Sequence, residues 1–179
     1  MLHWPGVLAG AEVAADPLRE DCAKLAAEAV AELAQTRKRE GAKLAQVLGE
    51  RLDAMKARVA DAQPLVPEVM RAFRDKLSAR VAEAGAAPSD DRLQQEVVLF
   101  AARIDVDEEL ERLGTHVEEF RRVLGKGGAC GKRLDFLCQE LNREANTLGS
   151  KSVSPDLTRI SVELKVLIEQ MREQVQNIE

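Results

Sequence analysis

Aromatic residues are scarce in this sequence: tyrosine is absent, and the 179 residues include one tryptophan and four phenylalanines. Many RNA-binding domains stack bases on several aromatic side chains gathered on one surface. The sequence has too few aromatic residues to build such a surface. An RNA-binding protein of the aromatic-stacking type is therefore not expected.

A broad basic surface is also missing. Acidic residues outnumber basic residues by 31 to 26, and the formal net charge is −5. Proteins that bind nucleic acid through a general electrostatic attraction usually carry basic stripes or a net positive charge. Any contact with nucleic acid must therefore use local basic patches, and nothing in the composition indicates DNA specifically.

Cysteine is sparse and long apolar runs are absent. Cys22, Cys130 and Cys138 form no CxxC pair and are odd in number, so reduced thiols in a cytoplasmic protein are the simplest interpretation. No apolar run approaches the roughly 20 residues that span a membrane, and no secretory-type signal opens the chain. The sequence predicts a cytoplasmic protein without a membrane partner.

The abundant residues favour helices. Hydrophobic residues make up 45% of the chain and charged residues 32%, and the high content of Ala, Leu, Glu, Lys and Arg is typical of long helices. No segment shows a clear alternation of apolar and polar residues. We therefore expect an all-α fold, with a long kinked helical arm followed by a compact helical bundle.

We expect residues 1–16 to form an irregular junction segment and residues 17–179 to form a single helical domain. The arm covers about residues 17–84, where apolar residues recur every three or four positions in a thin stripe. Pro64 and Pro67 should end or kink its first helix, because proline lacks a backbone donor and clashes with the preceding turn. A stripe this thin buries little surface in one chain, so we expect self-association.

The bundle covers about residues 89–179. Asp105 and Glu108 have the spacing of a capping box, with the aspartate at the cap and the glutamate three residues later. Two amphipathic helices are predicted at the end of the chain, over residues 131–149 and 155–178. Their apolar stripes are the strongest helical signal in the sequence.

Acidic residues gather at the start of the helix predicted after the capping box. Glu109, Arg112 and His116 share one helix face, and Glu108 lies beside them. Carboxylates hold hard divalent cations such as Mg or Mn, so Glu108 and Glu109 are candidate metal ligands. His116 is a candidate group for proton transfer. The alternative is a solvated face laced by pairs between glutamate and arginine.

The helix predicted at residues 131–149 carries a second group of candidates. Glu140 and Glu144 can hold a metal ion or act as a base, and Arg143 can bind a phosphate with its planar guanidinium. A short connection should make this helix an antiparallel neighbour of the preceding one. The four glutamates and His116 are then expected to converge. Alternatively, the polar side chains tie helices together across an oligomer interface.

Local positive charges form a third group of candidates in an otherwise acidic chain. Such clusters bind the phosphates of RNA, or they are merely solvated faces. The candidates for RNA binding are Arg121, Arg122, Lys132, Arg133 and Lys151.

Several long strings resemble one known family. They are RLDFLCQELNREANTLGSKS at residues 133–152, VELKVLIEQMREQVQNIE at 162–179, RIDVDEELERLGTHVEEF at 103–120 and WPGVL at 4–8. In this order they resemble the C-terminal part of the YicC/YloC family of bacterial endoribonucleases. The MTGFGR-like motif that opens the family's N-terminal half is not found, so we expect this chain to correspond to the C-terminal half.

The resemblance implies a metal-dependent endoribonuclease that cleaves RNA phosphodiester bonds and forms ring-like homo-oligomers, hexamers in particular. Within it, His116, Glu140, Arg143 and Glu144 are the candidate catalytic residues. One alternative is a non-catalytic module for oligomerisation and RNA positioning, with the catalytic residues in the other half of the protein. A plain helical scaffold without a role in RNA metabolism is a third, weaker hypothesis.

Overall fold

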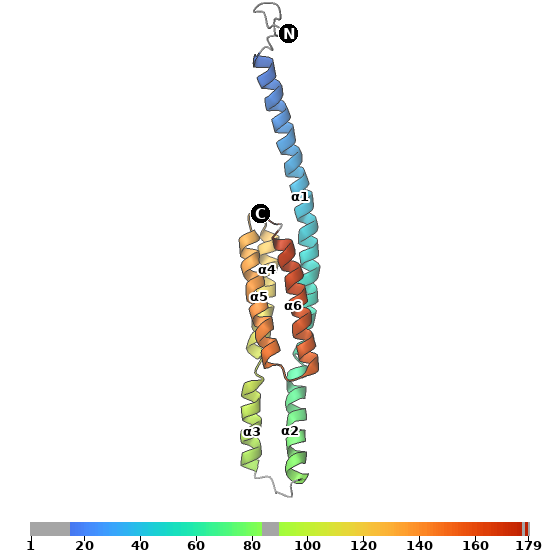
Figure 1. Cartoon of the computed structure of the whole chain (residues 1–179), viewed down its shortest axis with the longest axis vertical. Coiled ribbons are helices and arrows are strands. Elements are labelled where there is room, and N and C mark those ends of the chain that lie inside the picture. The colour runs from blue at the N-terminus through green and yellow to red at the C-terminus, as the bar shows by residue number, and fades with distance from the viewer. Residues whose placement is uncertain (1–14, 84–89, 177, 179) are drawn as a thin grey trace, which may run out of the picture. The chain divides into compact units, whose positions relative to one another are not determined.

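The computed structural model describes residues 15–83, 90–176 and 178 (Figure 1). Within these ranges the chain forms six helices and no strand, which confirms the prediction of an all-α fold. The predicted junction at residues 1–16 lies outside the described residues except for its last two. The helices are α1 (Ala15–Ala62), α2 (Leu65–Glu83), α3 (Asp90–Arg103), α4 (Asp107–Lys126), α5 (Gly131–Lys151) and α6 (Pro155–Val175).

The chain divides into two compact units, residues 1–43 and residues 44–179. In the first unit, the described side chains of residues 16–43 are exposed, with a half-buried Thr36 as the exception. Its apolar stripe is therefore open to solvent: Leu25 is 64% exposed and Leu33 is 57% exposed. None of the described helices in either unit has the length and apolar character needed to cross a membrane.

The core of the second unit is built by four helical segments. The last part of α1 packs with α4, α5 and α6, because each presents apolar residues at three- and four-residue spacing. The structure thus adds the end of α1 to the bundle predicted at residues 89–179. The largest fully buried side chains are Leu48, Leu52, Met55, Leu113, Phe120, Leu134, Leu137, Leu141, Leu148, Leu164, Ile168 and Met171.

The helices α2 and α3 pack on each other, and the start of α2 also contacts the core through the half-buried Leu65, Val66 and Val69. The break before α2 falls at Pro64, as predicted, and Pro67 lies within the first turn, where its missing N–H costs little. The rings of Phe73 and Phe100 are stacked, with centroids 3.6 Å apart. No described side chain of either helix is fully buried, so this pair is held mainly by a few half-buried contacts.

A short glycine-containing turn joins α4 to α5. Gly127 and Gly128 have φ angles of 67° and 80°, which side chains with a Cβ rarely adopt. The turn reverses the chain, and α4 and α5 pack side by side (Figure 1). The start of α4 differs from the expected capping box: the N-cap residue is Val106, one residue after Asp105, and no side chain caps the helix.

The helices α5 and α6 approach closely at one glycine. A Cβ at Gly149 would lie 2.6 Å from Oγ of Ser161. That hydroxyl is buried and donates a hydrogen bond of 2.8 Å to the carbonyl oxygen of Ala145. The absence of a side chain at position 149 therefore permits both the helix contact and the hydrogen bond.

We predict that Gly149→Ala lowers the free energy of unfolding by about 1–3 kcal/mol, because the new methyl group must displace the Ser161 hydroxyl and break its hydrogen bond. Chemical denaturation monitored by circular dichroism measures the change. The double variant Gly149→Ala/Ser161→Ala should recover much of the loss.

Gly114→Ala is the matched control, since a Cβ at Gly114 meets nothing within 4 Å. That variant should gain about 0.5–1 kcal/mol from the better helix propensity of alanine. Equal stability changes in the Gly149 and Gly114 variants would contradict the proposed close contact.

Candidate functional site at the ends of α4 and α5

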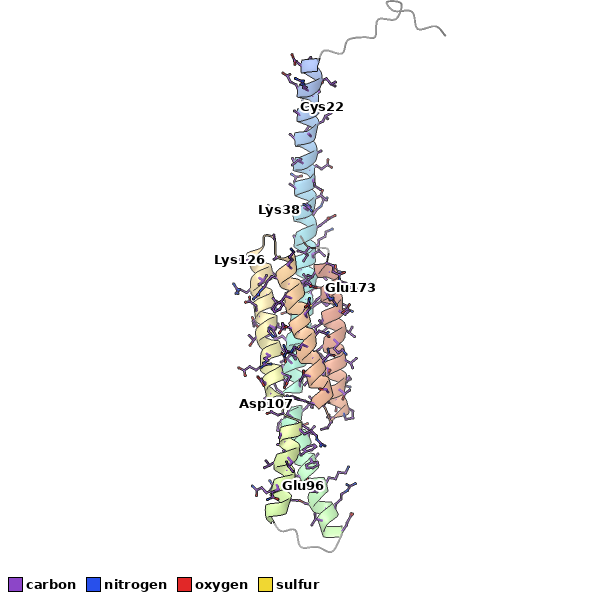
Figure 2. The ribbon with its side chains drawn as sticks, turned by 60° about the vertical axis from the view of Figure 1, so that its left-hand side comes forward. Cys22, Lys38, Glu96, Asp107, Lys126 and Glu173 are labelled. Carbon is purple, nitrogen blue, oxygen red and sulfur yellow. The ribbon has the colours of Figure 1, made fainter. Side chains whose placement is uncertain are left out.

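The predicted site residues lie along α4 and α5. Figure 2 labels Asp107 and Lys126, which mark the two ends of α4. The first turn of α4 is acidic and its last turn is basic, an order that complements the helix dipole. Because α5 runs antiparallel to α4, its last turn meets the acidic end and its first turn meets the basic end.

At the acidic end, a lysine from α5 is bound by the start of α4. Nζ of Lys151 lies 2.8 Å from Oε1 of Glu109, and it also donates a hydrogen bond of 2.7 Å to the carbonyl oxygen of Asp105. Glu109 is 6% exposed. Its second oxygen, Oε2, is buried without a hydrogen-bond partner among the described residues. Glu109 and Lys151, predicted to bind metal and RNA respectively, are therefore partners in an ion pair.

A second ion pair joins the same two helices through Arg112. Its Nη1 lies 3.6 Å from Oε1 of Glu144, and its Nη2 donates a hydrogen bond to Glu108 one turn earlier on α4. The side chain of Glu144 is only 4% exposed. A guanidinium group thus neutralises two of the carboxylates predicted to hold a metal or act in catalysis. This arrangement is the glutamate–arginine pairing that the sequence left open as the alternative.

The structure does not bring all the acidic candidates together. Across the described ranges, no three His, Cys, Asp or Glu side chains are arranged to hold a metal ion. His116 and Glu140 are half-buried, and Arg143 is exposed. In the single chain, Arg112 and Lys151 form ion pairs with three of these carboxylates, those of Glu108, Glu144 and Glu109. Convergence of the candidates on a metal ion stays a prediction. The individual roles of His116, Glu140 and Arg143 stay predictions.

The basic end brings together three residues from α4 and α5. Glu119 accepts hydrogen bonds of 2.7 and 2.8 Å from Nε and Nη2 of Arg122, and one of 3.4 Å from Nη2 of Arg133. The bonds from Arg122, with the single bond from Arg133, lower the pKa of Glu119 from 4.5 to about 2. Glu119 is therefore ionised at neutral pH and holds the guanidinium groups of two helices beside each other.

The other basic candidates differ in their partners. Arg121 donates a hydrogen bond of 2.5 Å to Oδ1 of Asp53 on α1, and a parallel bond of 2.8 Å joins Lys56 to Glu118. The hydrogen bond from Lys56 is the main cause of a lowered pKa of Glu118. Lys132 is exposed in the first turn of α5. Arg122, Arg133 and Lys132 thus present positive charge at one end of the bundle.

One residue at this end was not identified from the sequence. Phe136 is 48% exposed, although it lies between the buried Leu134 and Leu137 on α5. The guanidinium carbon of Arg133 lies 5.7 Å from the centroid of its ring, within the range of a cation–π contact. The available signal was the position of a large aromatic residue off the apolar stripe of its helix.

Comparison with known proteins decides the family. Residues 62–179 match the family model described as "Endoribonuclease YicC-like, C-terminal". The chain belongs to this family.

Two curated relatives extend the match. A protein of Haemophilus influenzae named "Probable endoribonuclease YicC" is 44% identical over 179 residues, which are all of this chain and 62% of the relative. A Clostridioides difficile protein of the same name is 37% identical over 155 residues, which are 85% of this chain and 53% of the relative. The chain thus spans between about half and three-fifths of the length of these relatives.

We predict that Lys151→Met lowers the free energy of unfolding by roughly 2–3 kcal/mol, because it leaves the Glu109 carboxylate buried without a cation. This loss is smaller than for a fully buried ion pair, because the side chain of Lys151 is 33% exposed to solvent. Thermal and denaturant unfolding measure the loss. The double variant Glu109→Gln/Lys151→Met should be more stable than Lys151→Met alone.

Lys132→Met is the control, because Lys132 is exposed and surface changes of this kind usually stay within about 0.5 kcal/mol. If Lys151→Met proved as stable as Lys132→Met, the ion pair at Glu109 would not contribute to the fold.

Proposed function

We propose that this chain is the C-terminal helical part of an endoribonuclease and that it binds the RNA substrate. The observation that carries the proposal is the family match over residues 62–179, together with relatives at 44% and 37% identity whose names include "probable endoribonuclease". Endoribonucleases cleave phosphodiester bonds within an RNA strand. The substrate is then a polyanion, which an acidic chain must contact through local positive charge.

The basic end of α4 and α5 supplies such a surface. Arg122 and Arg133 come from different helices and are held together by Glu119. Both guanidinium groups remain largely exposed, at 66% and 57% of the side-chain surface, so their remaining N–H donors are accessible to phosphate oxygens. Arginine suits this role because its planar group can donate two parallel hydrogen bonds to one phosphate.

The ion pairs at the acidic end favour RNA positioning over catalysis as the contribution of this chain. Arg112 and Lys151 already neutralise Glu108, Glu144 and Glu109. In this proposal these glutamates tie α4 to α5, and the bonds to RNA are made at the basic end. Catalysis then requires residues from the part of the relatives to which this chain does not align.

The second candidate function is catalysis by this chain itself. It is favoured by the half-buried His116 and Glu140, whose side chains can accept or donate a proton, and by the exposed guanidinium of Arg143. In this version Arg143 offsets negative charge on phosphorus. Dependence on a divalent cation such as Mg or Mn belongs to the proposal as a property to be measured.

The two candidates differ in what this chain does alone. We predict that it binds a labelled single-stranded RNA but leaves it uncut in the presence of Mg or Mn. A fusion to the remaining part of the H. influenzae relative should cleave the RNA, and a metal chelator should abolish the cleavage. Gel analysis of the RNA products measures both activities.

Cleavage by this chain alone would favour the catalytic candidate, provided that His116→Ala and Glu140→Gln remove it. The absence of both binding and cleavage, in the chain and in the fusion, would contradict the proposed function.

We also propose that the chain forms a homo-oligomer, and the resemblance to the family points to a hexamer. Leu18, Leu25, Val30 and Leu33 are each more than half exposed in the first unit, and apolar side chains spaced in this way along a helix usually pack against a partner. Light scattering should report a multimer at low micromolar concentration. Leu25→Glu/Leu33→Glu should reduce its mass, and a monomer of 19.7 kDa for the unmodified chain would contradict the proposal.

A further inference from the structure

We propose that Phe136 and Arg133 form a stacking site for one base of single-stranded RNA at the N-terminal end of α5. The inference rests on the proposed function, because it assumes that the chain binds RNA at its basic end. It extends that function by adding a contact to a base to the contacts with phosphates. It also revises the expectation from composition, since one exposed ring suffices for one base.

Phe136 is far more exposed than its apolar neighbours on α5. Neighbouring apolar residues on α5 are buried, with Leu134 at 0% and Leu137 at 2% exposure, whereas Phe136 is 48% exposed. Full burial of such a side chain stabilises a fold by about 1.5–3 kcal/mol. The bundle obtains only part of this stabilisation from Phe136, so a large area of the ring is left for a ligand.

The charged groups near the ring are held in place by ion pairs. Arg133 lies over the Phe136 ring, with 5.7 Å between its guanidinium carbon and the ring centroid. The same guanidinium reaches Glu119 on α4, which also binds Arg122. Glu119 therefore holds the Arg122 guanidinium beside that of Arg133, which lies over the exposed ring.

The segment around Phe136 has a positive charge that complements a polyanion. Between Glu118 and Phe136 the sequence carries five basic residues and three acidic residues, although the whole chain has a net charge of −5. Lys126 and Lys132 are exposed in this segment. Phosphates on either side of a stacked base would meet this positive charge, whereas an apolar partner would have to desolvate it.

Single-stranded RNA fits the site better than duplex RNA. Bases in a duplex are already stacked, and their faces are inaccessible to a side chain. An unpaired base can lie against the Phe136 ring, because every base has a π-face. Stacking on Phe136 therefore tolerates any RNA sequence and requires only an unpaired nucleotide in a flexible RNA backbone.

The test measures RNA affinity by fluorescence anisotropy, using the 179-residue chain and a labelled unstructured oligonucleotide. Phe136→Ala should weaken binding about tenfold, in keeping with the loss of one base–aromatic stack, and should leave the salt dependence of binding unchanged. Phe136→Leu keeps an apolar side chain without a π-face and should lose a similar share of affinity. Phe136→Trp keeps an aromatic ring and should bind RNA about as tightly as the unmodified chain.

Arg133→Gln separates phosphate contacts from stacking. It should weaken binding and also reduce the slope of log affinity against log salt by about one unit, since one phosphate contact is lost. Leu99→Ala, at a side chain that is 66% exposed on α3, is the matched control for the truncation of an exposed apolar residue. It should bind RNA like the unmodified chain.

Four outcomes would overturn the stacking site in different ways. Wild-type affinity in Phe136→Leu would show that only apolar area matters. A smaller oligomer in Phe136→Ala, with unchanged RNA affinity, would assign the ring to an interface between copies of the chain. If the unmodified chain binds RNA and all Phe136 variants bind equally well, the stacking inference fails alone. If the unmodified chain binds no RNA, the proposed function fails as well.

Discussion

The antiparallel packing of α4 against α5 sets the position of every charged group in the candidate site. At one end of the pair, Glu109 near the start of α4 meets Lys151 at the last residue of α5. At the other end, Glu119 on α4 meets Arg133 in the first turn of α5. Both contacts require the two apolar stripes to be buried in register against each other. Loss of this register would separate both ion pairs at once.

The helical fold was predictable because its signals are local. Apolar periodicity and Pro64 gave the all-α fold and the break before α2. The partners of each helix were less predictable. Residues 48–62 and residues 18–33 have the same kind of apolar stripe, yet the stripe at 48–62 is buried and the stripe at 18–33 is exposed. Burial here depends on which helices lie alongside, and a stripe does not specify its partner. The prediction of a capping box was wrong because the N-cap residue of α4 is Val106 and not Asp105.

The helix that carries each candidate residue was predictable, but the pairing of its charged side chain was not. Sequence spacing placed Glu108, Glu109 and His116 on one helix and Glu144 on the next. It did not show that Arg112 reaches both Glu108 and Glu144. A carboxylate cluster can be neutralised by a cation in solution or by a guanidinium from the chain. The choice depends on the offset between two helices, which single-sequence periodicity does not report.

The basic residues at the N-terminal end of α5 are unfavourably placed with respect to the dipole of that helix. The first turn of α5 has no acidic residue and carries Lys132 and Arg133, although cations near a helix N-terminus cost about 0.3–1 kcal/mol each. Glu119 offsets part of this cost from the neighbouring helix, and its pKa of about 2 keeps it ionised while it does so. Two arginines share that one carboxylate, so positive charge remains in excess. A bound phosphate would relieve both the repulsion and the unfavourable dipole, which supports placing the RNA contact at this end.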